Sequence, residues 1–266
     1  RLEIDVCAQH NNGGLSAGCW WESNLKRFFP VGEVNGTFGV YRPGGSALNS
    51  TQTGSARAAQ LIAAGYREAP MDGASLAGAA EPALGKILAL ARSFRDNAAN
   101  GKGAAPAALR EGYQRRMDGC GAMIRPSGPV KEALEECRRD LQTIASETAA
   151  RTADEMTDAF INRDILITQI AFLSAIDEYI GMGGLSRGSY LVCGAEGPDA
   201  SNCAGQGVPA DLDDGAFSDR VCEVAFDPES MECAFEWKPV RPIPTGYDDW
   251  FENVYNAYSR GEIIAP

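Results

Sequence analysis

A glycine-rich stretch carries the side chains in this sequence that are best suited to bind a cofactor. Residues 28–52 read FFPVGEVNGTFGVYRPGGSALNSTQ and contain Glu33, Arg42 and the glycine pair Gly44 and Gly45. A carboxylate just past the end of a strand can accept hydrogen bonds from ribose hydroxyls. A planar guanidinium can bind a substrate carboxylate. The stretch therefore predicts a site for a ribose-containing cofactor and an acidic substrate.

The small residues after Gly45 predict a helix whose N-terminus faces a ligand. The amides of Ser46, Ala47 and Leu48 would lie in its first turn without intrahelical partners, and such a helix end attracts negative charge. A reduced flavin carries negative charge around ring atoms N1 and O2, so this helix start is a suitable support for a flavin ring. Small residues such as Gly54 would also let the helix pack close to its neighbours. The alternative is a tight turn and a close helix contact without a ligand.

Residues 31–50, VGEVNGTFGVYRPGGSALNS, resemble the second FAD-contacting segment of the fumarate reductase and succinate dehydrogenase flavoprotein superfamily. In that family a GE pair precedes a sequence close to HGANRLGSNSL. Its glutamate binds the FAD ribose, its arginine binds a substrate carboxylate, and backbone amides before the leucine support the isoalloxazine ring. The resemblance gives Arg42 the substrate role. The cofactor-binding residues that it implies are Glu33, Gly45, Ser46, Ala47 and Leu48. Ser46 and Phe38 replace the family's asparagine and histidine, which leaves the substrate open.

A second segment, AQHNNGGL at residues 8–15, resembles the family's HYTMGGI, whose histidine binds the other substrate carboxylate. Aligning the two glycine pairs places Gln9 under that histidine, one residue before His10. His10 is the only histidine in the chain, and an imidazole can donate a hydrogen bond to a carboxylate in either charge state. We therefore expect His10 and Arg42 to be the catalytic residues, with Gln9 as the alternative and a structural role for His10 as another.

The resemblance extends from about residue 6 to residue 188, and it implies the C-terminal portion of an FAD-dependent oxidoreductase. Hydride would pass between the flavin and the C=C bond of an unsaturated carboxylate. Family members begin with a GxGxxG segment and carry a capping domain, and neither is found in this sequence. The FAD site would be completed by the upstream half of the same enzyme or by a partner subunit. The alternative is a non-enzymatic helical interaction module that retains a relic of the flavin site, and an amine or aspartate oxidase is a third interpretation.

Two short strands are expected to position the glycine-rich stretch. One is at residues 2–6, where apolar and acidic residues alternate, and the other is at residues 28–31. Helices follow. Pro82 and Pro129 suit the first turns of two of them. The apolar face of the first comprises Leu84, Ile87, Leu88, Ala91 and Phe94. That of the second comprises Val130, Leu134, Cys137, Leu141 and Ile144. Residues 107–117 predict another helix, residues 153–181 predict a long central one, and residues 96–106 predict a flexible link.

These patterns, with the resemblance, predict an α+β fold in three parts. Residues 1–70 would be the C-terminal part of an FAD-binding domain, with short strands and one small-residue helix. Residues 71–188 would be a helical bundle domain. Residues 189–266 would be an irregular tail with a β-hairpin.

The hairpin is predicted from RVCEVAFDPESMECAFEW, with its turn at residues 227–230. In the expected register Val224 faces Cys233 and Cys222 faces Phe235. The two thiols then lie diagonally across the strands, where a disulfide is poorly placed.

The eight cysteines form no CxxC pair, so neither zinc binding nor redox chemistry is indicated. Cys193 and Cys203 lie in a loop-like segment and would form a disulfide only in an exported protein. Reduced thiols and a cytoplasmic location are expected. The chain opens at Arg1 inside an expected strand, which favours a fragment or a processed subunit of a longer protein.

The charge of the chain bears on its partners. The formal net charge is −12 and the Lys and Arg residues are scattered, so nucleic acid is not an expected partner. The most apolar stretch, residues 165–176, contains polar side chains and is flanked by Asp164 and Asp177, so no transmembrane segment is expected. A hydrophobic content of 44% indicates a globular protein with a core.

Overall fold

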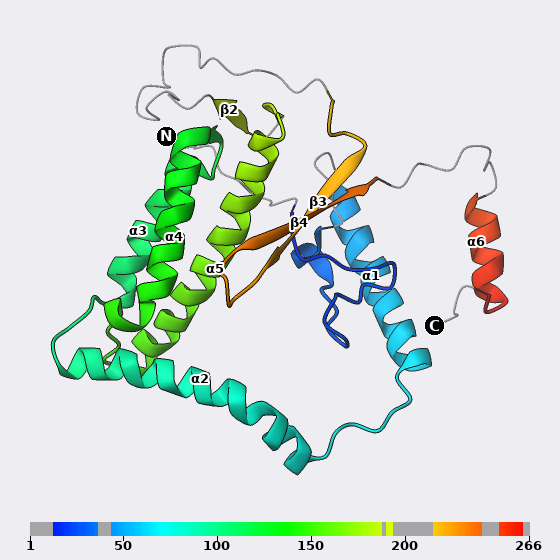
Figure 1. Cartoon of the computed structure of the whole chain (residues 1–266). Coiled ribbons are helices and arrows are strands. Elements are labelled where there is room, and N and C mark those ends of the chain that lie inside the picture. The colour runs from blue at the N-terminus through cyan, green and yellow to red at the C-terminus, as the bar shows by residue number, and fades with distance from the viewer. Residues whose placement is uncertain (1–12, 37–43, 188–189, 194–214, 241–249, 263–266) are drawn as a thin grey trace, which may run out of the picture. The chain divides into compact units, whose positions relative to one another are not determined.

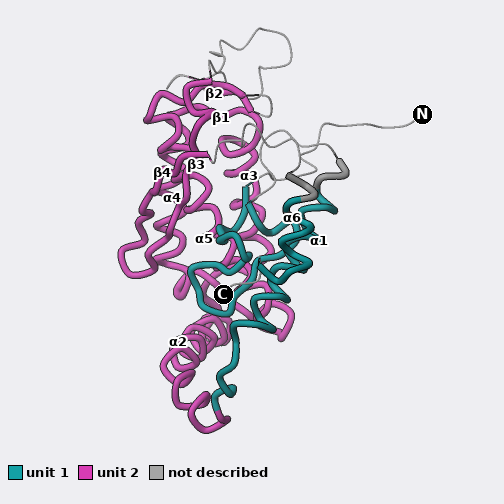
Figure 2. The backbone as a smooth tube through the Cα atoms, turned by 90° about the vertical axis from the view of Figure 1, so that its right-hand side faces the viewer, with its two compact units in different colours: residues 1–71, 243–266 teal, residues 72–242 magenta. Residues whose placement is uncertain are grey.

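The computed structural model describes residues 13–36, 44–187, 190–193, 215–240 and 250–262 of the chain. These residues form helices, short strands and an antiparallel hairpin, which confirms the predicted α+β class (Figure 1). The chain divides into two compact units (Figure 2): Arg1–Met71 with Ile243–Pro266 is unit 1, and Asp72–Pro242 is unit 2. The strand predicted at residues 2–6 lies outside the described residues.

Unit 1 is built around the small-residue helix α1 (Gly44–Gly65), with the short 3-10 helix η1 (Gly32–Val34) beside it and helix α6 (Trp250–Ser259) near the end of the chain. Gly54 allows close packing here, because a Cβ at this position would lie 2.5 Å from Nε1 of Trp21. The predicted close contact of the small-residue helix is thus confirmed at this glycine.

The short buried strand predicted at residues 28–31 does not form. The Phe28 amide donates to the carbonyl of Leu25 at 3.0 Å, and the Ser23 amide donates to the carbonyl of Phe28 at 2.9 Å. Arg27 adopts a positive φ of 68°, and the Phe28 side chain is 47% exposed. The prediction is wrong because local turn bonds occupy the backbone groups that a strand would present to a neighbour.

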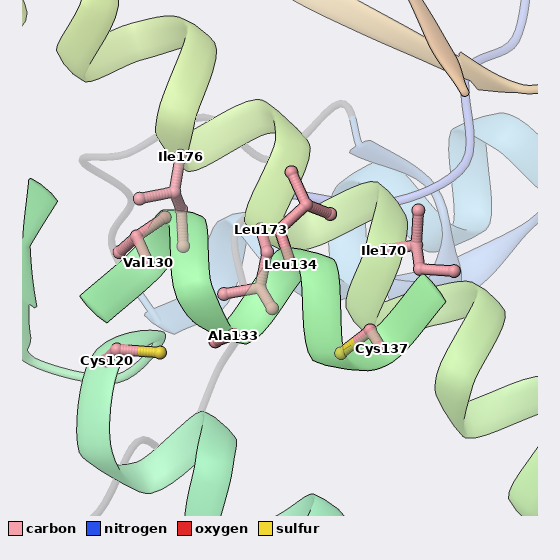
Figure 3. Packing of buried hydrophobic residues seen from close by; sticks show 8 residues of the cluster. All are labelled: Cys120, Val130, Ala133, Leu134, Cys137, Ile170, Leu173 and Ile176. Atoms are coloured by element: carbon pink, nitrogen blue, oxygen red, sulfur yellow. The ribbon is translucent and has the colours of Figure 1, made fainter. Parts of the chain in front are cut away.

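Unit 2 is a helical bundle with strands at its edge. Its helices are α2 (Gly73–Ala99), α3 (Pro106–Cys120), α4 (Ser127–Glu147) and α5 (Ala153–Gly181). The observed bounds of α5 match the predicted central helix, and the helix predicted at residues 107–117 is confirmed as part of α3. Helix α4 packs along α5 (Figures 1 and 3).

The core between α4 and α5 forms from the predicted apolar face of α4. In Figure 3 the side chains of the two helices point toward one another. This cluster comprises Cys120, Val130, Ala133, Leu134, Cys137, Ile170, Leu173 and Ile176. A second core gathers Phe94, Tyr113, Ile144, Ala150, Ala159 and Leu166. Leu141 is half-buried and packs against both cores, so all five predicted positions on α4 face the interior.

A polar network joins three helices of the bundle through Arg116 of α3. Its guanidinium contacts Asp140, Glu136 at 3.2 Å and the Cys137 sulfur at 3.1 Å on α4. It also donates to the side-chain oxygen of Gln169 on α5 at 3.2 Å. A buried guanidinium needs such partners, so the network favours one register of the three helices.

Helix α2 differs from its prediction at both ends. It begins at Gly73, where the Asp72 carboxylate accepts hydrogen bonds from the amides of Ala74 and Ser75 at 3.0 Å. Pro82 therefore lies inside the helix instead of in its first turn. Phe94 is buried, whereas other residues of the predicted face are about half exposed: Leu84 at 51%, Ile87 at 49% and Leu88 at 53%. In Figure 1 the N-terminal half of α2 extends beyond the other helices of its unit.

The link predicted at residues 96–106 is an ordered connection. Helix α2 continues to Ala99. The Ala104 amide then donates to the carbonyl of Glu147 at 2.7 Å, and the Ala149 amide donates to the carbonyl of Ala104 at 2.8 Å. The prediction of flexibility is wrong because these backbone bonds fix the loop to the end of α4. Helix α4 itself begins at Ser127, two residues before Pro129.

The hairpin pairs β3 (Arg220–Phe226) with β4 (Cys233–Pro239), and its register differs from the expected one. Val224 faces Phe235, and Cys233 faces Phe226. The turn comes one residue later than predicted, because the Asp227 amide still donates to the carbonyl of Glu232 at 2.9 Å and Met231, at a φ of 58°, donates to the carbonyl of Asp227. Cys222 and Cys233 are free thiols in this register too.

A second, parallel pair of short strands, β1 (Ile124–Pro126) and β2 (Leu191–Cys193), completes the described sheets. Cys203 lies outside the described residues, so its predicted redox state stays a prediction.

Two of the described helices, α2 and α5, are long and apolar enough to cross a membrane by length and composition alone. The apolar window of α5 is 44% buried inside the protein, as is typical of a core helix, whereas that of α2 is not buried. The absence of a transmembrane segment, which was expected from residues 165–176 alone, stays a prediction.

Candidate functional site

The predicted site falls in unit 1, and the structure describes part of it. His10, its alternative Gln9, and Arg42 lie outside the described residues. Glu33 is exposed in η1. The other cofactor-binding positions, Gly45, Ser46, Ala47 and Leu48, lie in the first turns of α1.

The start of α1 determines which amides a ligand would meet. In a helix that begins at Gly44, the amides of Gly44, Gly45 and Ser46 have no intrahelical acceptor, whereas the Leu48 amide reaches the carbonyl of Gly44. The available amides are therefore two residues earlier in the chain than expected. The first turn of α1 carries no acidic side chain, so none of its own carboxylates complements the positive end of the helix dipole. The Leu48 side chain is 68% exposed.

The two sequence segments that were singled out separately lie against each other. The Leu15 amide donates to the carbonyl of Val34 at 2.7 Å, and the Gly36 amide donates to the carbonyl of Leu15 at 3.1 Å. Gly14 permits this contact, because a Cβ there would lie only 2.4 Å from the Val34 oxygen. The glycine pair of AQHNNGGL thus adjoins the segment that carries Glu33.

Glu33 and the start of α1 are separated along the helix. Gly32, at a φ of 81°, faces Thr51, since a Cβ there would lie 4.0 Å from the Thr51 methyl carbon. Thr51 is seven residues beyond Gly44, which corresponds to about 10 Å along the helix axis. The backbone beside Glu33 therefore lies about two turns along α1 from the helix N-terminus, and the two can contact different parts of one extended ligand.

Polar contacts that could not be read from the sequence hold residues 13–36 against α1 and the residue after it. The Glu22 carboxylate accepts hydrogen bonds from the Arg27 amide at 2.7 Å and from the Tyr66 hydroxyl. Both bonds lower the pKa of Glu22, and the bond from the Arg27 amide has the larger effect. The hydrogen bond to Glu22 in turn raises the pKa of Tyr66. The Arg57 guanidinium donates to the carbonyl of Cys19 at 2.7 Å. We assign these groups a structural role, because each is occupied by another part of the same unit.

Over the described ranges, no group of three or more His, Cys, Asp or Glu side chains is arranged to hold a metal ion. The chain matches no protein-family model, and no curated protein matches it at a significant level.

Proposed function

We propose that the chain is the C-terminal portion of an FAD-dependent oxidoreductase, similar to fumarate reductase flavoproteins, that acts on a small unsaturated carboxylate. The observation that supports this proposal best is the contact between residues 13–15 and 34–36. It brings together the two segments that resemble the substrate- and FAD-contacting segments of that family.

Each residue has a defined task in this proposal. Glu33 accepts hydrogen bonds from a ribose of FAD, and the amides at the start of α1, including those of Gly45 and Ser46, support the electron-rich edge of the ring. Arg42 and His10 hold the substrate carboxylates and orient the double bond. When bound, FAD supplies the hydride chemistry. Gly32, the neighbour of Glu33, faces Thr51, which is about 10 Å along the helix axis from the start of α1, and this spacing suits a cofactor that lies extended along α1.

The test restores the missing half of the site. The chain is co-expressed with the protein segment encoded upstream of it, and flavin absorbance and reduction of an enoate by a reduced dye are measured. Arg42→Ala should abolish the enoate reduction while flavin stays bound, because the guanidinium contacts substrate. Arg67→Ala, at an exposed arginine of the same unit, is the matched control and should keep the activity. A purified complex without flavin, or full activity of Arg42→Ala, would overturn the proposal.

A helical interaction module is the second candidate, and one observation favours it. Helix α2 exposes large apolar side chains ahead of its buried residue Phe94, which are Leu76 at 57%, Leu84 at 51%, Ile87 at 49% and Leu88 at 53%. Such a row is typical of a helix that packs against a partner. A start codon directly upstream of Arg1 in the gene would favour this candidate, whereas a GxGxxG-encoding segment there would favour the enzyme.

A further inference from the structure

Unit 2 contains a pocket of about 410 Å³ where α4, α5 and β4 meet. Leu134, Phe235 and Cys233 supply its apolar surface. Burial raises the pKa of the Cys233 thiol, so this side chain is uncharged near neutral pH. The pocket lies entirely within unit 2, so its chemistry is independent of the flavin proposal.

The first group of charged residues at the pocket is centred on Arg138. Its guanidinium bonds to Glu135 on α4 at 2.7 Å and to Glu232 in the hairpin loop at 2.7 Å. Only 17% of the Arg138 side chain is exposed. One guanidinium therefore faces two carboxylates, and this side of the pocket has a net negative charge.

The second group lies on the α5 side. Asp177 is 3.9 Å from the ammonium of Lys131, whose side chain is 67% exposed. An ion pair at this distance and exposure is weak, so a ligand can replace the lysine. Glu178 accepts a hydrogen bond from the indole nitrogen of Trp237 at 3.1 Å, which leaves its charge in place. The lining thus holds four carboxylates against two cations, and it favours a positively charged ligand.

A buried hydroxyl in the lining points to the same conclusion independently. Ser174 is 3% exposed and lines the pocket. Its hydroxyl lies beside the Cys233 thiol, a weak hydrogen-bond partner, and it has no other partner among the described residues. Buried hydroxyls without a good partner are rare, because the lost hydrogen bond costs free energy. Ser174 and Asp177 are three residues apart on α5 and so lie on the same face of the helix.

We propose that this pocket binds a small organic amine in its ammonium form. The ammonium donates hydrogen bonds to the Asp177 carboxylate and to the Ser174 hydroxyl, and the apolar part of the ligand lies on Leu134 and Phe235. A simple metal cation fits the site less well, because no cluster of three ligating side chains is present among the described residues. An anion would meet the net negative lining.

The experiment uses phenethylamine, which joins a primary ammonium to an aromatic body, as the probe and the full chain as the target. Binding at pH 7 is followed by ligand-observed NMR and titration calorimetry, with phenylacetate as an anion of similar shape. Asp177→Asn removes the charge with little change of shape, and Ser174→Ala removes the hydroxyl. Asp164→Asn is the matched control, since Asp164 lies on the same helix with a side chain that is 74% exposed and does not line the pocket.

We expect saturable binding of phenethylamine and none of phenylacetate. Asp177→Asn should weaken the affinity for phenethylamine about fivefold to tenfold or more, and Ser174→Ala should weaken it about threefold to tenfold. Asp164→Asn should leave this affinity unchanged. Circular dichroism of each variant checks that the fold is kept. No saturable binding below about 10 mM, equal binding of phenylacetate, or undiminished affinity in both pocket variants would overturn the proposal.

Discussion

Replacing Gly14 with alanine should separate the two segments of the candidate site. The new Cβ would lie 2.4 Å from the carbonyl oxygen of Val34, whereas ordinary contacts of this kind exceed about 3.2 Å, so the backbone must move by close to 1 Å. Such a shift breaks the bond from Leu15 to Val34, at 2.7 Å, and the bond from Gly36 to Leu15, at 3.1 Å. At about 0.5–1.5 kcal/mol each, the two bonds contribute about 1–3 kcal/mol to holding the segments together.

Hydrogen exchange of the Gly36 amide measures this effect directly. A loss of about 1–3 kcal/mol should accelerate its exchange about 5-fold to 150-fold in Gly14→Ala. Gly18→Ala is the matched control in the same segment, because its Cβ would meet nothing nearer than 3.8 Å. If the Gly36 amide exchanges at the same rate in both variants, the close approach of the two segments described above does not exist, and the proposed site loses its main support.

Three further predictions concern unit 2. Leu173→Ala should lower the free energy of unfolding by about 2–5 kcal/mol, since Leu173 is fully buried, whereas the same change at the exposed Leu84 should cost no more than about 0.5 kcal/mol; urea titration measures both. Hydrogen bonds from the Ser75 amide and hydroxyl and the Ala74 amide lower the pKa of Asp72, so the cap is present above about pH 4 and is lost as the pH falls further. The protection of the first amides of α2 against exchange, measured relative to their intrinsic rates at each pH, should decrease there. Burial raises the pKa of Cys137 to about 11, so the native thiol should resist alkylation at pH 8 while the exposed Cys19 reacts, and the stability that Cys137 contributes should be complete below about pH 9 and lost as the pH rises through about 11. Labelling of Cys137 in the native protein at pH 8 would contradict its burial.

Local periodicity predicted most of the bundle, because the core depends on it. The face of α4 from Val130 to Ile144 repeats at helical spacing, and a long apolar helix such as α5 has one stable place, which is the interior. The start of α2 was missed for the opposite reason. Pro82 is a strong local signal for a first turn, but the carboxylate cap at Asp72 and the favourable residues around it extend the helix past that proline.

The hairpin register could not be read from the sequence with the turn residues alone. Asp227 and Pro228 mark a turn correctly, but its exact position depends on the positive φ that Met231 adopts, and methionine gives no sign of that conformation. The candidate site was predicted as two separate segments. Their contact depends on a close backbone approach at Gly14. The glycines of α1, Gly44 and Gly54, are ten residues apart, and this spacing does not indicate which loop packs against the helix.

The pocket for which amine binding is proposed was not predicted from the sequence for a comparable reason. Its lining comes from three elements, and its most informative group, Ser174, resembles any small polar residue in the middle of an apolar helix. Only the packing of the hairpin on α4 and α5 leaves that hydroxyl buried beside a thiol.

Pro82 divides α2 into two mechanical parts. A proline in a helix interior has no amide hydrogen to donate to the carbonyl one turn earlier, that of Gly78, and its ring presses on that turn. The turns before it carry no buried side chain, whereas the turns after it end at Phe94 in the core. Residues 73–81 can therefore unfold separately while the bundle stays intact, and among the helices of unit 2 that the structure describes, limited proteolysis should cleave this segment first.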